Sequence, residues 1–443
     1  MENRSEIKAA ESTEPASAPK QPQIDPWDPI IGSQHSFLNE LECITEMVDL
    51  VLPVLKKRDE ERRQRIKELA EEISNENGTY LRTKSATDII EVIGHIKKLQ
   101  QGEQMFRQGV VTSIVSKFDE FFTDVLKVSY RENPSWLLTA DKKISHAEVL
   151  QIASLESFKD DIIGKEIDAL MRDSHLKQLK FIDDKLKLGI EKEFPGWLEF
   201  LEITERRNLF VHAGAAVSCQ YMENCSKWGV SLGKNIKEGV PLSASDDYIR
   251  KTLDCFYELS VRVAQAAVRR MFPESFESLD KVLNDSTVGL LVEERWSLAE
   301  KIFTFALSIP DNLMSRKGYR MYFLLNRCIS RKFSGQDYIT DLRSEDWTPF
   351  HPKFQFAVAV LEDRFEDAEK LMRSEAVRNE IHETDFKEWP LLREFRKSEL
   401  FLVAYKEIFS KDFNEQLLDD ATKEMEAQQV SEFNDSSEEV ELS

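Results

Sequence analysis

Apolar residues recur at steps of three and four along most of the 443-residue chain, and this helical spacing constrains the fold more than any other feature. Glycine and proline number only 15 and 14, whereas strand-rich proteins need many turn residues. We therefore predict an all-α fold, with a helical bundle followed by a second, repeat-like helical domain. A chain of this length exceeds one ordinary core, so two or three domains are expected.

Breaks in the helical pattern divide the chain into five predicted parts. These are a disordered N-terminal segment at 1–26, a helical arm at 27–83, a bundle domain at 84–273, a second helical domain at 280–411 and an acidic disordered tail at 412–443. Within the arm, Pro53 is expected to kink or divide the helix. Residues 84–131 are predicted to form two helices, and 198–217 and 248–271 one helix each.

The second half of the 84–131 segment carries a wide apolar stripe, which is typical of a buried bundle helix. Its members are Val111, Ile114, Val115, Phe118, Phe121, Phe122, Val125 and Leu126. Asp119 lies at the edge of this stripe. In the second domain, residues 357–369 weakly resemble the helix-turn-helix of tetratricopeptide repeats, but no self-repeat of fixed period supports a solenoid.

The formal net charge of −21 disfavours tight, sequence-indifferent binding of nucleic acids, because an acidic protein repels polyanions at long range. A small RNA-cleaving pocket remains compatible with it, since such a pocket needs only two or three cations. The charged run from Lys56 to Arg65 is either a solvated helix face or a stripe that contacts RNA.

Other sequence features bear on the compartment and on cofactors. The five cysteines are scattered without CxxC spacing, which is typical of free thiols in a reducing compartment. Cys219 and Cys225 lack a nearby histidine run, so we predict no metal site and no cofactor. No apolar stretch is long enough for a signal peptide core or a membrane helix, and the protein is predicted to be cytoplasmic. Phosphate-binding loops, GxSxG and HExxH motifs are missing from the sequence, which disfavours kinases, serine hydrolases and metalloproteases.

The segment from Phe200 to Tyr221, FLEITERRNLFVHAGAAVSCQY, concentrates the candidate chemistry. On a helix Asn208 and His212 share a face, so the amide could orient the imidazole. Arg207 and His212 are five residues apart, about 140° around the helix. They could share a cleft through the length of the arginine side chain, especially in a cleft formed with a second subunit.

Arg207 and His212, with Asn208 after the arginine, match the Arg-x(4–6)-His motif of the HEPN superfamily. The sequence from Glu205 to Gly214, ERRNLFVHAG, resembles the core motif of a bacterial, defence-associated branch of that superfamily. Residues 115–124, with Asp119, are similar to the first core helix of that branch, and 178–182 resemble its pre-motif helix more weakly. Some HEPN toxins carry a tyrosine two residues after the histidine, but this chain has Gly214 there. The resemblance covers residues 85–272.

The resemblance implies a helical bundle that dimerises and cleaves RNA without a metal, as a toxin or anti-phage effector. Arg207 and His212 would be the catalytic residues, and Asn208, Asp119 and Arg206 would support them. Histidine can transfer protons near neutral pH, and arginine can bind the phosphate. The implied partners are an RNA substrate, a second copy of the chain, and a protein partner or antitoxin bound through the C-terminal helical domain.

Several alternatives stay open from the sequence. Arg207 and His212 could be structural, and the protein could be a non-catalytic HEPN dimerisation or protein-binding scaffold. Asp119 could form a buried ion pair with Arg206 or Arg207 instead of acting in catalysis. The remaining histidines, among them His175, show no partner pattern and are interpreted as structural.

Overall fold

The computed structural model describes residue 25 and residues 27–75, 78–83, 86–139, 154–315 and 317–413. Within these ranges the fold is all-α, as predicted, with seventeen α-helices and one short two-stranded hairpin. Most of the two segments predicted to be disordered, 1–26 and 412–443, lies outside the described residues.

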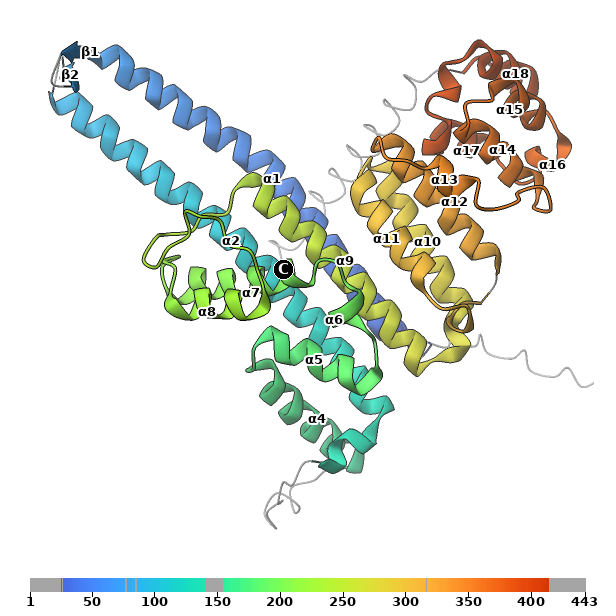
Figure 1. The fold of residues 1–443 in the computed structure, drawn as a ribbon, viewed down its shortest axis with the longest axis horizontal. Coiled ribbons are helices and arrows are strands. Elements are labelled where there is room, and N and C mark those ends of the chain that lie inside the picture. Colours follow the sequence, from blue (N-terminus) through green and yellow to red (C-terminus); the bar gives the residue numbers. More distant parts are fainter. Residues whose placement is uncertain are drawn as a thin grey trace, which may run out of the picture.

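The first two-thirds of the chain form the bundle and its projecting arm (Figure 1). Its elements are α1 (Asp28–Leu69), β1 (Ala70–Asn75), β2 (Gly78–Thr83), α2 (Ala86–Glu132), a 3₁₀ turn (Pro134–Thr139), α4 (Leu155–Met171), α5 (His175–Leu186), α6 (Ile190–Glu193), α7 (Trp197–His212), α8 (Cys219–Trp228) and α9 (Asp246–Met271).

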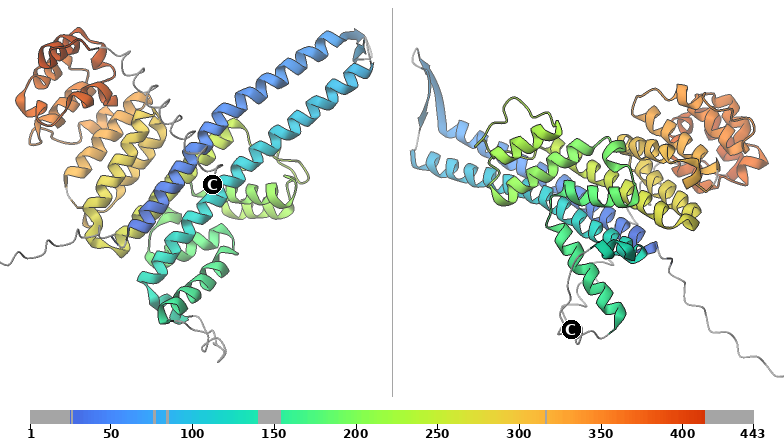
Figure 2. Two further views of the ribbon diagram at one scale, coloured as in Figure 1. Left: turned by 180° about the vertical axis from the view of Figure 1, so that it is seen from behind. Right: turned by 60° about the horizontal axis from the view of Figure 1, so that its bottom comes forward.

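Helices α1 and α2 lie side by side as a long antiparallel pair, and the β1–β2 hairpin joins them at the far tip (Figures 1 and 2). The spacing of apolar residues did not predict this hairpin. The other end of the pair belongs to the bundle, because α9 packs against both helices and buries apolar residues of α1. Residues 27–83, predicted as an arm, therefore also supply part of the core.

Pro53 does not divide its helix, because α1 continues from Asp28 to Leu69 with the proline inside it. Of the two effects expected of this proline, division of the helix is therefore wrong. Proline removes one backbone donor and frees the carbonyl four residues earlier. Pro53 is exposed, which allows water to satisfy that carbonyl. The long contact with α2 then holds the helix together on the opposite side.

Helix α2 runs without a break from Ala86 to Glu132, where two helices were predicted over 84–131. No proline interrupts this segment, and its glycines at 94, 102 and 109 do not break it. Glycine inside a helix costs only about 1 kcal/mol relative to alanine, which packing against α1 can offset. The Ser-x-x-Glu sequence at 145–148, which has the spacing of a helix-capping box, lies outside the described residues. The cap observed at the start of α4 is Ser154.

The core of the bundle centres on Phe118 of α2, which is 1% exposed. Its ring contacts Phe37 of α1, Phe200 of α7 and Phe256 of α9, with ring centroids 5.1–6.1 Å apart. One residue thus joins four helices, and each edge-to-face pair contributes about 0.5–1.5 kcal/mol beyond the area it buries. The apolar stripe of α2 is a core surface, as the spacing of its residues predicted.

The C-terminal region is a second set of short helices on the far side of α9 (Figure 1). Its α-helices are α10 (Phe276–Val292), α11 (Trp296–Ser308), α12 (Lys317–Phe333), α13 (Ile339–Leu342), α14 (Pro352–Leu361), α15 (Phe365–Met372), α16 (Glu375–Arg378), α17 (Glu383–Glu388) and α18 (Glu399–Phe409). Neighbouring helices pack as pairs, α11 on α12 and α14 on α15.

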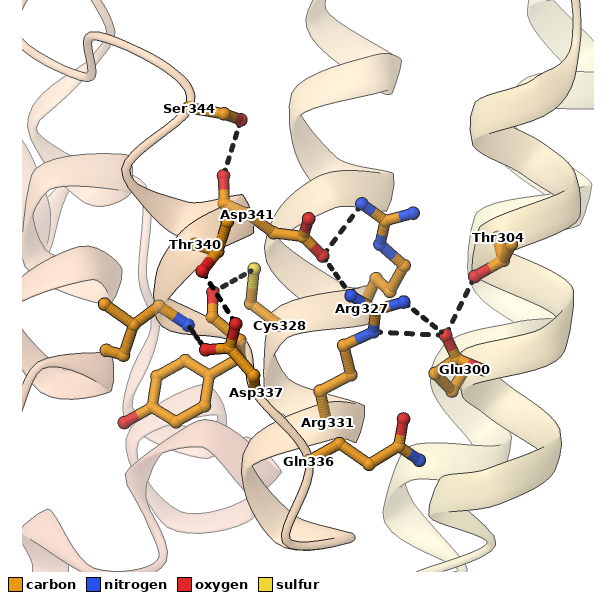
Figure 3. Close-up of polar contacts among 12 residues, drawn as sticks. Glu300, Thr304, Arg327, Cys328, Arg331, Gln336, Asp337, Thr340, Asp341 and Ser344 are labelled. Atoms are coloured by element: carbon orange, nitrogen blue, oxygen red, sulfur yellow. Dashed lines mark hydrogen bonds and ion pairs between the residues drawn. The ribbon is translucent and has the colours of Figure 1, made fainter.

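A chain of ion pairs holds α11, α12 and α13 together (Figure 3). Arg331 donates through Nε and Nη2 to Glu300 Oε1 at 3.1 and 3.0 Å, and through Nη1 to Asp341. Arg327 Nη2 lies 2.9 Å from the same Asp341 oxygen. Because one carboxylate binds two guanidiniums one helical turn apart, this cluster fixes α13 on α12 and is structural.

Candidate functional site

Helix α7 positions most of the residues predicted for the site. The inner face of α7 is buried and includes Phe200, Leu201 and Ile203. The polar residues 205–208 are partly exposed and lie along the sides of the helix. The helix ends at His212, and Gly214 and Ala215 then turn the chain at φ +55° and +67°. A side chain at Gly214 would meet no atom within 4 Å. The positive φ, not a close approach, therefore favours glycine at this position.

Arg206 belongs to a buried polar cluster and not to an open site. Its Nε donates to Glu202 Oε1 at 2.7 Å, and its guanidinium lies 4.1 Å from the ring centroid of Tyr248. Tyr221 and Tyr248 donate their hydroxyls to the two Glu202 oxygens at 2.6 and 2.8 Å. Arg206 is thus a pairing residue that ties α7 to α8 and α9.

The pKa shifts in this cluster follow from burial and from mutual contact. Burial and the carboxylate of Glu202 raise the pKa of the Tyr221 and Tyr248 phenols. Burial opposes the charge on Arg206, but Tyr248 and Glu202 outweigh it and raise the pKa of the guanidinium. At neutral pH both phenols therefore stay protonated donors and Arg206 stays charged, which keeps all three partners of Glu202 in place.

Arg207, the next residue, has a different environment. Its side chain is 22% exposed, and its Nη2 lies 3.9 Å from Asp119 Oδ2 on α2. Its Nη1 donates a long hydrogen bond of 3.4 Å to Asn208 Oδ1, and its Nε is buried without a partner among the described residues. The Nε atoms of Arg269 and Arg327 are buried in the same way, so the loosely bound Nη1 and Nη2 of Arg207 are the donors that an added anion could reach.

Asp119 is the acidic member of the site, and it has a partner that the sequence did not reveal. Its Oδ1 lies 3.0 Å from Nε2 of His175 on α5. The side chain of His175 is 9% exposed, and that of Asp119 is 27% exposed. The structure therefore brings together Asp119, His175 and Arg207 from three helices. Of the two ion pairs considered for Asp119, the pair with Arg207 is present as a loose contact of 3.9 Å, and the pair with Arg206 is not formed.

His212 is exposed at the C-terminal end of α7. It has no hydrogen bond or ion pair to any residue that the structure describes. The expected Asn208–His212 contact is not formed, because the Asn208 oxygen accepts from Arg207 instead. In a single chain His212 thus faces solvent, while Arg207 lies half-buried beside α2.

His175, Glu202, Tyr221 and Tyr248 were not predicted from the sequence as members of the site. Glu202 lies four residues before Arg206, so helical spacing alone could have suggested this ion pair. His175 lies 32 positions from Arg207 along the chain and has no local motif. Only the packing of α5 beside α2 and α7 brings it to Asp119.

No group of three or more His, Cys, Asp or Glu side chains is arranged to hold a metal in the ranges that the structure describes. Cys219 is exposed and Cys225 is buried, so the two do not share an open site. None of the described helices has the length and apolarity needed to cross a membrane.

Comparison of the chain with protein-family models, with curated proteins and with solved structures finds no match in any of the three.

Proposed function

We propose that this protein is a metal-independent endoribonuclease of the HEPN type, in which Arg207 and His212 carry out the cleavage. The observation that carries the proposal is Arg207, a partly exposed guanidinium whose Nη1 and Nη2 have contacts of only 3.4 and 3.9 Å, on the same helix as an exposed histidine. Arginine with unfilled donors can bind a phosphate by two parallel hydrogen bonds.

The residue types fit cleavage by the neighbouring 2′-hydroxyl of RNA. His212 would take the proton of that hydroxyl or deliver one to the leaving oxygen. Arg207 would stabilise the charge that develops on the phosphate. The product would be a 2′,3′-cyclic phosphate, with Asn208 orienting Arg207, Asp119 bordering the site and Arg206 holding the helix.

The site would be completed by a second copy of the chain. His212 faces solvent in the single chain, and it is separated from Arg207 by about 140° around α7. A homodimer that apposes two α7 helices would surround the RNA with two Arg–His pairs. We further propose that the protein is a cytoplasmic toxin or anti-phage effector, with the C-terminal helices binding a protein partner or antitoxin.

The test is cleavage of total cellular RNA by the purified full-length protein and by His212→Ala, with EDTA present. His35→Ala is a matched control, because His35 is also exposed but lies on α1. We expect wild type and the control to leave cyclic-phosphate ends and His212→Ala to be slower by about 10²–10⁴-fold, the usual contribution of general acid–base catalysis. Equal cleavage by His212→Ala and wild type would contradict the assignment.

A non-catalytic scaffold is the second candidate, and an exposed stripe on α1 favours it. Met47, Leu50 and Val54 are 51–72% exposed at steps of three and four, as in a helix that binds another helix. If wild type and His212→Ala are both inactive, pull-downs with wild type and with Leu50→Glu would test this candidate. A partner that binds wild type and not the variant would support it.

A further inference from the structure

Asp119 is shared between two cationic or potentially cationic side chains. Its Oδ1 lies 3.0 Å from Nε2 of His175, within hydrogen-bond distance, whereas its Oδ2 lies 3.9 Å from Nη2 of Arg207. Hydrogen bonds between guanidinium and carboxylate groups are normally about 2.7–2.9 Å long. The carboxylate is thus bound to the histidine and stands away from the arginine.

His175 is fixed firmly enough to hold Asp119. It is the first residue of α5, it is buried, and its ring packs edge-on against Phe200 of α7 with centroids 6.3 Å apart. The other histidines that the structure describes are exposed. Among the histidines that the structure describes, His175 is therefore the one whose imidazole is buried and directly contacts a carboxylate.

Arg207 is bound more loosely than the other arginines of α7 and α9 that are at least partly buried. Arg206 and Arg262 each donate to a glutamate four residues earlier at 2.7–2.8 Å, and Arg269 donates to Asp280 at 2.7 Å. The described contacts of Arg207 are a hydrogen bond of 3.4 Å and an ion pair of 3.9 Å. If Asp119 were released from His175, it could close on Arg207 and form the tight pair that these other arginines form.

We propose that His175 is a positioning residue that holds Asp119 away from Arg207 and so keeps the Arg207 guanidinium available for a phosphate. The inference rests on the proposed ribonuclease function for its substrate, RNA, but the geometry that it invokes can be measured without catalysis. His175 acts through Asp119 and does not touch the substrate.

Two variants and a double variant separate this role from general damage. His175→Phe keeps a ring against Phe200 and removes the bond to Asp119, so Asp119 should pair with Arg207. His175→Gln keeps an N–H donor and should behave as wild type. His175→Phe combined with Asp119→Asn removes the competing charge and should free Arg207 again. Melting temperatures establish that each protein is folded.

The first readout is the reaction of Arg207 with phenylglyoxal, followed by peptide mass spectrometry with the exposed Arg378 as internal reference. We expect His175→Phe to slow labelling of Arg207 by about tenfold or more, since a charge-assisted hydrogen bond contributes roughly 1.5–3 kcal/mol. The Gln variant and the double variant should label at the wild-type rate. Equal labelling in wild type and folded His175→Phe overturns the proposal.

The second readout is RNA cleavage, in which KM and kcat are separated. We expect His175→Phe to raise KM about tenfold or more through lost phosphate binding, with a smaller change in kcat, and the Gln variant to restore KM. If wild type cleaves no RNA, the proposed function fails, while the labelling experiment still decides whether His175 controls Arg207. Should His175→Phe not fold, His175→Ala removes the same contact with Asp119: slower labelling of Arg207 in the folded variant supports the proposal, and an unchanged rate overturns it.

Discussion

Arg206 and Arg207 show how one residue step on a helix changes the role of a side chain. Successive residues are 100° apart around α7, so Arg206 points toward α8 and α9 and Arg207 toward α2. Arg206 meets a buried glutamate at 2.7 Å, whereas Arg207 meets Asp119 at 3.9 Å. The first arginine is bound by the fold, and the second remains able to bind a ligand.

The Glu202 cluster should be essential for the stability of the bundle. Glu202→Gln leaves the buried Arg206 without its carboxylate, and breaking a buried ion pair in this way costs roughly 3–5 kcal/mol. We expect a loss of about 3 kcal/mol in the free energy of unfolding, measured by urea denaturation. Glu156→Gln is the control, because its side chain is 76% exposed and should change stability by under about 0.5 kcal/mol. A Glu202→Gln protein as stable as the control would rule out this role.

The cysteines should differ in reactivity according to burial. Cys43 and Cys219 are exposed, and Cys225, Cys255 and Cys328 are buried. Burial raises the pKa of Cys225 to about 11 and that of Cys328 to about 12, so these thiols hold little reactive thiolate at neutral pH. We expect iodoacetamide to label Cys43 and Cys219 in the native protein and all five cysteines in denaturant. Rapid native labelling of Cys328 would contradict the packing of α12.

At the scale of elements, the α1–α2 pair is held by contact between the helices more than by the propensity of each segment. Pro53 sits on the exposed side of α1, where it still removes one helix hydrogen bond. Pro53→Ala should therefore stabilise the protein by about 1–3 kcal/mol in urea denaturation. Val54→Ala, at the next exposed position, should leave stability nearly unchanged. A loss of stability in Pro53→Ala would mean that α1 is not a continuous helix at residue 53.

Glu383 joins α17 to α18 and to the residues that follow α18. Its Oε1 accepts from Lys387 at 2.7 Å and from Lys411 and the Tyr405 hydroxyl at 2.8 Å. These contacts, with Lys387 first, lower the pKa of the carboxyl from its ordinary 4.5 to about 2. A carboxyl whose pKa is lower in the folded state than in the unfolded state stabilises the fold at pH values above its unfolded pKa. This stabilisation is lost as the pH falls through the folded pKa.

The consequence for α17 and α18 can be measured by comparing Glu383→Gln with wild type. We expect the variant to melt at a lower temperature at pH 7, with the difference shrinking as the pH falls from about 4.5 toward about 2. Glu399→Gln, at the exposed start of α18, is the control. A difference that stays constant across this pH range would mean that the Glu383 contacts do not form.

At the scale of the whole molecule, the net charge of −21 opposes the approach of RNA to any site. The acidic residues of the C-terminal tail, among them Asp419, Asp420, Glu438, Glu439 and Glu441, add to this repulsion. Truncation after Phe413, which keeps the ring contacts of Phe413 with Phe401 and Tyr405, should raise RNA cleavage. Because the effect is electrostatic, the gain should fall as salt rises; unchanged cleavage at low salt would exclude it.

The sequence alone determined the all-α class and most of the helices, because periodic burial leaves a direct record in the spacing of apolar residues. It predicted α9 as a single helix and also α7, although α7 ends at His212 and not at 217 as expected. It also singled out Arg207, which the structure leaves with unfilled donors. Local spacing could not foresee the uninterrupted α1 and α2, since contact between these helices offsets the cost of proline and glycine.

Only the tertiary structure decided which polar residues meet. Asp119, His175 and Arg207 come from α2, α5 and α7, and their contacts depend on how these helices pack around Phe118. The same packing assigned Arg206 to Glu202 and left His212 in solvent. The physical reason is range: helix formation depends on neighbours within one or two turns, whereas a site assembled from three helices depends on side chains that the chain brings together from far apart.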